Sequence, residues 1–215
     1  MSITVLSRKL LENSQNWYRA LDMFDVILDR DGVLNVDVGY THRLEDFALA
    51  PGVVEGLTLL TSLGARLSIA TGQSGIDRGK YEEEQMQAFN EKLVAEIAPH
   101  DITFAAIVFC PHHPDYSDEC TCRKPKTGML EQIEAKLGPI VWENAWGIGD
   151  KPADADMILT KGGSSILIES GEHNNSTGTS YWSVDDPELA TLLANPKNFV
   201  AYDILAAATL IETKI

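Results

Sequence analysis

Basic residues are scarce in this chain of 215 residues. It has 17 lysines and arginines against 32 aspartates and glutamates, so its formal net charge is -15 and its sequence pI is about 4.6. Nucleic acids and anionic membranes bind proteins through broad basic surfaces. The charge balance therefore argues against both as partners, although a local basic pocket can still bind a small anionic substrate.

Long apolar runs are also missing from the sequence. No stretch is long enough to span a bilayer. The segment at the N-terminus lacks the continuous apolar core and the small-residue cleavage site of a signal peptide. We therefore expect a cytoplasmic protein.

Cysteine is rare, and its distribution is uneven. The three cysteines, Cys110, Cys120 and Cys122, fall in one short segment. A cytosolic environment keeps thiols reduced, so a cluster of this kind favours a metal site over disulfide bonds.

With 215 residues, of which 44% are hydrophobic, the chain can form one domain with a full core. The sequence shows no internal repeats. Residues 1–22 carry leucines and a tryptophan at helical spacing, which predicts a helical extension packed on the domain, with an oligomer contact as the alternative. Residues 23–215 are predicted to form a single domain with a C-terminal helical tail. We expect a monomer.

Apolar segments alternate with amphipathic segments along the chain. The predicted strands cover 24–28, 65–70, 102–109, 145–148 and 165–169. The predicted helices cover 53–63, 82–98, 128–137 and 152–161, with one or two more in 187–214. The Gly- and Ser-rich stretch 171–180 is predicted to be a flexible loop. This alternation is typical of the α/β class and predicts a Rossmann-like, doubly wound parallel sheet.

Two carboxylates follow the first predicted strand. Asp29 and Asp31 are separated by one residue and followed by Gly32. In an extended chain they would lie on the same side, and two such anions repel each other unless a cation separates them. Mg²⁺, a hard cation that binds oxygen ligands, suits this place. The alternative is an acidic turn without a ligand.

Other polar groups follow later strands. Thr71 and Ser74 come after the second strand, Lys124 after the third and Asp150 after the fourth. The carboxyl ends of parallel strands meet at one edge of a sheet, so these side chains are expected to converge on Asp29. Carboxylates, a hydroxyl and a lysine around a metal are suited to phosphoryl transfer. Taken singly, each residue could also be a helix cap, a solvated lysine or a turn residue.

The sequence resembles a known family at these positions. Asp29-Arg30-Asp31-Gly32, Thr71, Lys124 and Gly149-Asp150 match, in order, the motifs of the haloacid dehalogenase superfamily of phosphatases. The longer stretches LDRDGVLNVDVGY, TGQSGIDRGKY, FCPHHPDYSDECTCRKPKTGML and GIGDK are similar to the D-glycero-D-manno-heptose 1,7-bisphosphate 7-phosphatases and the related histidinol-phosphatases. The resemblance implies a Rossmann-like sheet with little or no cap domain.

The resemblance also implies roles for individual residues. Asp29 would be the nucleophile that forms an aspartyl-phosphate, and Asp31 would be the general acid and base. Lys124 and Thr71 would hold the phosphoryl group. Mg²⁺ would be bound by Asp29, Asp150 and the backbone carbonyl of Asp31. A neighbouring carboxylate could raise the pKa of Asp31, as a general acid requires, while Mg²⁺ would oppose that shift.

The implied activity is the Mg²⁺-dependent hydrolysis of a small phosphorylated metabolite, above all a heptose bisphosphate at its 7-phosphate. One alternative is a phosphatase that acts on histidinol phosphate or another phosphomonoester. The other is a non-catalytic, zinc-stabilised binding module.

The cysteine segment predicts a second metal site. Three thiolates and an imidazole are enough for a closed tetrahedral Zn²⁺ site, which would be structural because no ligand position remains for water. The family pattern Cys-x-His and Cys-x-Cys selects the ligands Cys110, His112, Cys120 and Cys122. His113 would cap the loop or contact a ligand. The alternative is a reduced loop without metal.

Residues that bind the substrate are predicted from the resemblance alone. They are Asp37, Gly39, Tyr40, Gln73, Ser74, Arg123 and Lys151. A sugar bisphosphate needs a second anion clamp, for which the forked guanidinium of Arg123 or of Arg78 is suited. One position departs from the family pattern, because Gly72 stands where asparagine usually follows the threonine.

Overall fold

The computed structural model describes residues 23–169 and 187–215. The predicted helical extension over 1–22 and the predicted loop over 171–180 lie outside the described residues. Within them, a six-stranded parallel sheet has the order β3-β2-β1-β4-β5-β6. The strands are β1 (Phe24–Leu28), β2 (Ala65–Gly72), β3 (Ala106–Cys110), β4 (Trp146–Gly149), β5 (Ser164–Ile168) and β6 (Asn198–Ala201).

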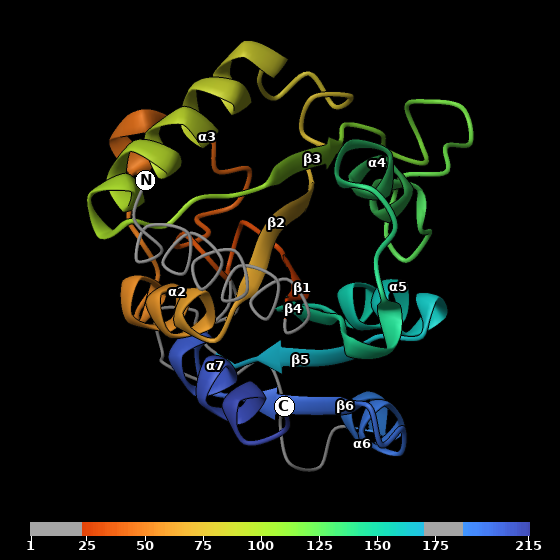
Figure 1. The fold of residues 1–215 in the computed structure, drawn as a ribbon. Helices are drawn as coiled ribbons and strands as arrows, with labels where there is room; N and C mark the ends of the chain where they lie inside the picture. The colour runs from red at the N-terminus through yellow and green to blue at the C-terminus, as the bar shows by residue number, and fades with distance from the viewer. Residues whose placement is uncertain (1–22, 170–186) are drawn as a thin grey trace, which may run out of the picture.

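Helices cover both faces of this sheet (Figure 1). They are α2 (Val53–Ser62), α3 (Glu83–Ile97), α4 (Gly128–Leu137), α5 (Pro152–Lys161), α6 (Pro187–Leu193) and α7 (Ile204–Glu212). Helices α2, α3 and α7 lie on one face, and α4, α5 and α6 on the other. The doubly wound parallel sheet expected from the alternation is therefore confirmed.

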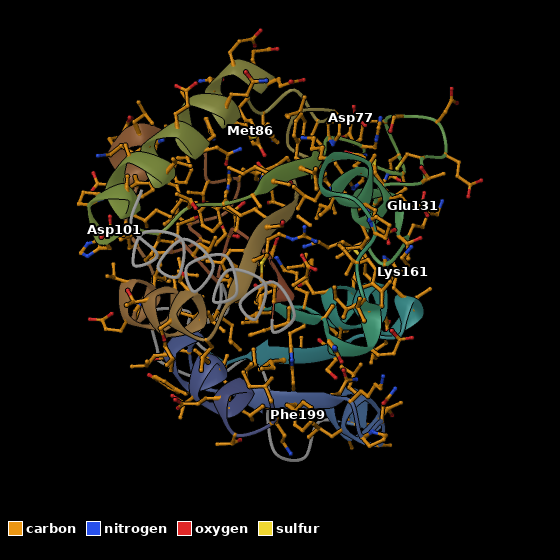
Figure 2. The ribbon with its side chains drawn as sticks, viewed as in Figure 1. Asp77, Met86, Asp101, Glu131, Lys161 and Phe199 are labelled. Carbon is orange, nitrogen blue, oxygen red and sulfur yellow. The ribbon has the colours of Figure 1, made fainter. Side chains whose placement is uncertain are left out.

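The central strand β1 is buried on both faces, as expected for a strand between two helical layers. Val26 and Leu28 pack into the apolar cluster beneath α2, α3 and α7, while Ile27 packs into the cluster beneath α4 and α5. Figure 2 shows side chains filling both layers and labels Met86 of α3, which is fully buried. Burial of each such side chain contributes about 1.5–3 kcal/mol, so β1 is a firm base for the residues that follow it.

The sheet has a topological switch point between β1 and β4. The chain lays β2 and β3 on one side of β1, then returns to lay β5 and β6 on the other side of β4. Leu28 pairs with Ile148, so Asp29 and Gly149 lie at the same level at the carboxyl end of the sheet. Ligands of such sheets bind in the crevice at this point, outside the carboxyl ends of the strands.

Two sequence predictions were wrong in detail. The tail 187–214 was expected to hold only helices, but β6 lies between α6 and α7 and pairs with β5. This strand has four residues, too few for a periodic pattern, and only the exposed edge of the sheet selects its extended form. The strand predicted over 102–109 begins only at Ala106, where pairing with Ser68 of β2 starts.

No cap domain is inserted among the described residues. The segment between β1 and α2 holds only the short 3-10 turn Leu44–Asp46, which agrees with the expectation. None of the helices described in 23–169 and 187–215 is long and apolar enough to cross a membrane.

Candidate active site

A cavity of about 380 Å³ lies at the carboxyl ends of the strands, where the sequence placed the site. Its walls come from the segments after β1, β2, β3 and β4, which are far apart in sequence. The lining residues are Asp29, Asp31, Asp37, Gly39, Tyr40, Gly72, Ser74, Gly75, Tyr81, Cys110, Arg123, Lys124, Lys151, Ala153 and Asp154. The parallel sheet therefore brings together most of the predicted site residues.

Asp29 is held at the base of this cavity. Its backbone amide donates to the carbonyl of Ile148 at 2.8 Å, so the segment after β1 is fixed to β4. Its Oδ1 accepts a hydrogen bond from Lys124 Nζ at 2.8 Å, and the same ammonium lies 2.5 Å from Asp154 Oδ1. Burial and their like charges would disfavour two ionised carboxylates at this place. The Lys124 ammonium lies between them and offsets that cost.

Asp29, Asp150 and Asp154 form a buried acidic cluster, with carboxylate oxygens within 4.8 Å of one another. Burial raises the pKa of Asp150 well above its usual value, and the charges of Asp29 and Asp154 raise it further. Burial likewise raises the pKa of Asp154, while the Lys124 charge opposes the shift. Burial works against the charged form of Lys124 itself, but the two carboxylates outweigh it and raise its pKa.

The cluster fits a divalent cation. Both carboxylate oxygens of Asp150 are buried, and no described residue donates a hydrogen bond to them. Lys151 Nζ lies 3.7 Å from Asp150 Oδ2, which is too far for a hydrogen bond. Buried carboxylate oxygens of this kind are costly unless a cation binds them. Oxygen donors at this spacing are the ligands that Mg²⁺ prefers.

Asp31 lies beside Asp29 but has different partners. Arg30 Nε and Nη2 donate to its two carboxylate oxygens at 3.0 and 2.8 Å, and Asn35 and Gln73 each donate one more bond. The pKa of Asp31 is raised chiefly by burial, against the opposing Arg30 charge, with smaller contributions from Asp37 and Asp29. The expected upward direction is present, but its main cause is burial rather than a neighbouring carboxylate.

The predicted substrate residues divide into two groups. Asp37, Gly39, Tyr40, Ser74, Arg123 and Lys151 line the cavity. Gln73 does not line it. Its side chain is 1% exposed and lies behind Asp31 and Thr71, to which its amide donates at 2.8 Å in each case.

Gly72 leaves open space on the cavity wall, since no atom lies within 4 Å of where a Cβ would be. Arg78, the other candidate anion clamp, is not among the lining residues. Its guanidinium contacts the ring of His113 and lies 5.9 Å from the ring centres of Tyr40 and of Tyr116.

The cysteine segment folds into a compact cluster beside the cavity. Cys110 Sγ lies 2.9 Å from Cys122 Sγ and 3.8 Å from Cys120 Sγ, and His112 Nδ1 lies 3.2 Å from Cys122 Sγ. All four ligand atoms are within 4.8 Å of one another. Four ligands about 2.1–2.3 Å from one tetrahedral Zn²⁺ would lie roughly 3.4–3.8 Å apart. The Cys110–Cys120 separation matches this, while the Cys110–Cys122 separation is shorter.

The cluster is tied to the residues that enter the cavity. Arg123 follows Cys122 directly and donates from Nη1 to the carbonyl of His112 at 3.1 Å, and Lys124 is the next residue. His113 lies outside the cluster, since its amide donates to Asp77 Oδ2 at 2.8 Å and its ring contacts Arg78. Figure 2 labels Asp77, which lies close to the end of β3.

Comparison with known proteins decides the family. A D-glycero-beta-D-manno-heptose-1,7-bisphosphate 7-phosphatase from Photorhabdus laumondii is 38% identical over 157 residues, 70% of this chain and 83% of the relative. The 7-phosphatase of the same name from Yersinia pestis is 36% identical over 159 residues, which are 71% of this chain and 84% of the relative. The chain belongs to this phosphatase family of the haloacid dehalogenase superfamily. No protein-family model matches it.

Solved structures agree with this membership. The D,D-heptose 1,7-bisphosphate phosphatase from B. bronchiseptica, complexed with magnesium and phosphate, is 27% identical with a TM-score of 0.74. The match covers 90% of this chain and all of that one. The corresponding enzyme from Burkholderia thailandensis, 23% identical with a TM-score of 0.61 over 88% of this chain and 99% of that one, shares the fold. The family resemblance and fold expected from the motifs are confirmed.

Sequence reasoning missed three residues of the site. Asp154 joins the acidic cluster from the first turn of α5, where its Oδ2 also accepts from the Lys151 amide at 3.0 Å. The sequence feature that pointed to Asp154 was its position one helical turn after Asp150. Gly149 permits this approach, because a Cβ there would lie 2.2 Å from the Asp154 Cβ. Arg30 and Tyr81 gave no signal, because their burial at the site depends on packing between distant segments.

Proposed function

We propose that this chain is a Mg²⁺-dependent phosphatase that hydrolyses D-glycero-beta-D-manno-heptose 1,7-bisphosphate at its 7-phosphate through an aspartyl-phosphate on Asp29. One observation carries the proposal. Asp29 lies at the base of a cavity at the switch point of the sheet. Its Oδ1 accepts a hydrogen bond from the Lys124 ammonium, and Asp150 and Asp154 complete the acidic cluster around it. The substrate follows the names of the relatives.

The first step is the transfer of the phosphoryl group to Asp29. Lys124 contacts Oδ1, which leaves Oδ2 to attack phosphorus while the bond to the sugar oxygen breaks. Lys124, which lines the cavity, and the buried Thr71 hydroxyl behind it would hold the phosphoryl oxygens. Mg²⁺ bound by Asp29, Asp150 and the Asp31 carbonyl would offset negative charge on the phosphoryl group.

Asp31 moves the protons in both steps. In the first step, its carboxylic acid gives a proton to the sugar oxygen as that oxygen leaves. In the second step, its carboxylate takes a proton from the water that attacks the aspartyl-phosphate, and inorganic phosphate is released. The raised pKa of Asp31 favours the acid that the first step needs.

The cavity wall supports a sugar bisphosphate as the substrate. Arg123 and Lys151 bring cations to an otherwise acidic site and are suited to the phosphate that is not cleaved. Asp37 is suited to accept hydrogen bonds from sugar hydroxyls, and the exposed ring of Tyr40 offers an apolar surface to the sugar.

We also propose that Cys110, His112, Cys120 and Cys122 bind a structural Zn²⁺. Three thiolates and one imidazole complete a tetrahedral set, so no position is left for a reacting water. Such a site would brace the loop that carries Arg123 and Lys124.

A substrate panel tests this function. The protein, dialysed into Mg²⁺-free buffer, is assayed for phosphate release from heptose 1,7-bisphosphate, histidinol phosphate and other phosphomonoesters, before and after Mg²⁺ is added. We expect no turnover without Mg²⁺, and a kcat/KM for the heptose bisphosphate at least about tenfold above the others. A preference for histidinol phosphate would show that the proposed substrate is wrong. No phosphate release from any compound would favour a non-catalytic binding module.

A further inference from the structure

The carboxylate of Asp31 is held by a complete set of donors. Arg30 Nε and Asn35 Nδ2 each donate to Oδ1 at 3.0 Å, and Arg30 Nη2 and Gln73 Nε2 each donate to Oδ2 at 2.8 Å. Two carboxylate oxygens offer about four lone-pair positions, so the set is full. These four bonds fix the plane of the carboxylate and therefore the direction in which it faces the cavity.

Arg30 supplies two of these four bonds. It is fully buried and is fixed by Asn90 Oδ1 at 2.9 Å and by the carbonyl of Thr41 at 3.0 Å. The amide of Asn35 is anchored by a second bond to the carbonyl of Val36 at 2.9 Å, which also needs a donor. Both donors are therefore held in place by bonds that do not involve Asp31.

Gln73 is also held by partners of its own. Its Nε2 also contacts Thr71 Oγ1 at 2.8 Å, and its Oε1 accepts from the Tyr81 hydroxyl at 2.7 Å. Because Oε1 is engaged by the Tyr81 hydroxyl, the NH₂ group of the amide faces Asp31 and donates to it.

Tyr81 is built into this arrangement. Its side chain is almost fully buried, and its ring stacks on His42 with the ring centres 4.6 Å apart. Gly75 makes room for it, since a Cβ there would lie 2.2 Å from a ring carbon of Tyr81. The ring is thus fixed by packing at the cavity wall, and its hydroxyl donates to Gln73.

We propose that Gln73 and Tyr81 form a positioning pair that holds the Asp31 carboxyl group in its place on the cavity wall. Gln73 touches Asp31, and Tyr81 fixes Gln73. This inference rests on the proposed function, in which Asp31 protonates the leaving sugar oxygen and then takes a proton from water. It assigns to Gln73 a role behind the general acid instead of a direct contact with the sugar.

Leaving groups of different basicity separate a positioning role from a general loss of structure. A sugar alkoxide needs a proton as it leaves, whereas p-nitrophenolate leaves readily as an anion. The kcat/KM value reports on steps up to the first irreversible one, the transfer to Asp29. Misplacing Asp31 should therefore lower kcat/KM for the sugar phosphate and spare kcat/KM for p-nitrophenyl phosphate.

The experiment compares wild type with Tyr81→Phe, Gln73→Leu, Asp31→Asn and the control Tyr202→Phe, whose ring is exposed and remote from the cavity. The substrates are heptose 1,7-bisphosphate and p-nitrophenyl phosphate, with Mg²⁺ present. For the sugar phosphate we expect kcat/KM to fall about tenfold in Tyr81→Phe and about 100-fold in Gln73→Leu, within the range of acid catalysis. For p-nitrophenyl phosphate we expect changes below about threefold, with Tyr202→Phe unchanged on both.

The outcomes distinguish the inference from the function it rests on. If wild type releases no phosphate, or if Asp31→Asn keeps its activity on the sugar phosphate, the proposed function fails and the positioning pair falls with it. If Asp31→Asn loses that activity but Tyr81→Phe and Gln73→Leu keep it, only the positioning pair is overturned. Equal losses on both substrates would also overturn it. Should Gln73→Leu fail to fold, Tyr81→Phe decides alone, because it removes one oxygen and keeps the ring.

Discussion

Lys124 Nζ and Asp29 Oδ1 are 2.8 Å apart, although the two residues are separated by 95 positions in the chain. The pair is almost fully buried, with side-chain exposures of 12% and 9%. An ammonium in this position holds the carboxylate still and offsets its charge, so that a phosphate dianion can approach. The pair thus joins the first strand to the loop braced by the cysteine cluster.

Asp29→Asn should abolish turnover while the protein stays folded. An amide is a poor nucleophile, so the loss in kcat should be about a thousandfold or more. Phosphate release and a thermal melt on the purified variant check both halves of the prediction. The matched control is Asp156→Asn, an exposed position on α5 that should keep wild-type activity. Near-normal turnover in folded Asp29→Asn would show that another group attacks phosphorus.

Asp150→Asn should stabilise the Mg²⁺-free protein while it removes Mg²⁺-dependent activity. The folded pKa of Asp150 lies above its ordinary value of 3.8, so the folded state binds its proton more tightly than the unfolded state does. Stability from this group is therefore lost as pH rises above about 4. Relief of the buried charge at neutral pH should add about 1–2 kcal/mol to the free energy of unfolding.

Melting curves from pH 4 to pH 8 in Mg²⁺-free buffer measure this effect. The gain from Asp150→Asn over wild type should grow with pH and shrink toward pH 4. The groups that face Asp150 are Asp29, Asp154, Lys124 and Lys151, so the same series on Asp156→Asn controls for remote charge. A variant that melts below wild type at neutral pH would show that the Asp150 carboxylate is not strained without the ion.

Cys120→Ser should lose zinc and soften the loop that carries Arg123 and Lys124. The wild-type protein should hold about one Zn²⁺ per chain, since there is one four-ligand set, and the variant should hold much less. The melting temperature should fall because the binding free energy of such an ion is partly folding free energy. Elemental analysis, melting and steady-state kinetics test each link. Zinc loss with unchanged stability and kinetics would show that the ion supports neither the loop nor the site.

Gly72→Asn should tighten substrate binding without strain. The position faces the cavity and leaves open space around the new Cβ. An amide there can donate to the substrate, which should lower KM a fewfold, and replacing a strand glycine should add about 0.5–1 kcal/mol of stability. Gly72→Ala is the matched control, because it should show the stability gain alone. An unchanged KM in Gly72→Asn would mean that the amide does not reach the substrate.

The local sequence determined the elements that carry the site. The apolar run of β1 followed by Asp29, and the amphipathic segments of α4 and α5, were readable because strand and helix periods are local properties. The spacing of Cys110, Cys120 and Cys122 indicated a metal site, and the family pattern selected His112 as the fourth ligand. The convergence of Asp29, Lys124 and Asp150 followed from the geometry of any parallel sheet.

Tertiary structure alone decided the rest. Tyr81, Gln73 and Asp31 meet through contacts between segments after different strands, and no periodic pattern records such a contact. β6 is extended because β5 offers unpaired backbone groups, which four residues of sequence cannot reveal. Burial, not a neighbouring charge, sets the direction of the Asp31 pKa shift, and burial depends on the packing of the whole chain around that carboxylate.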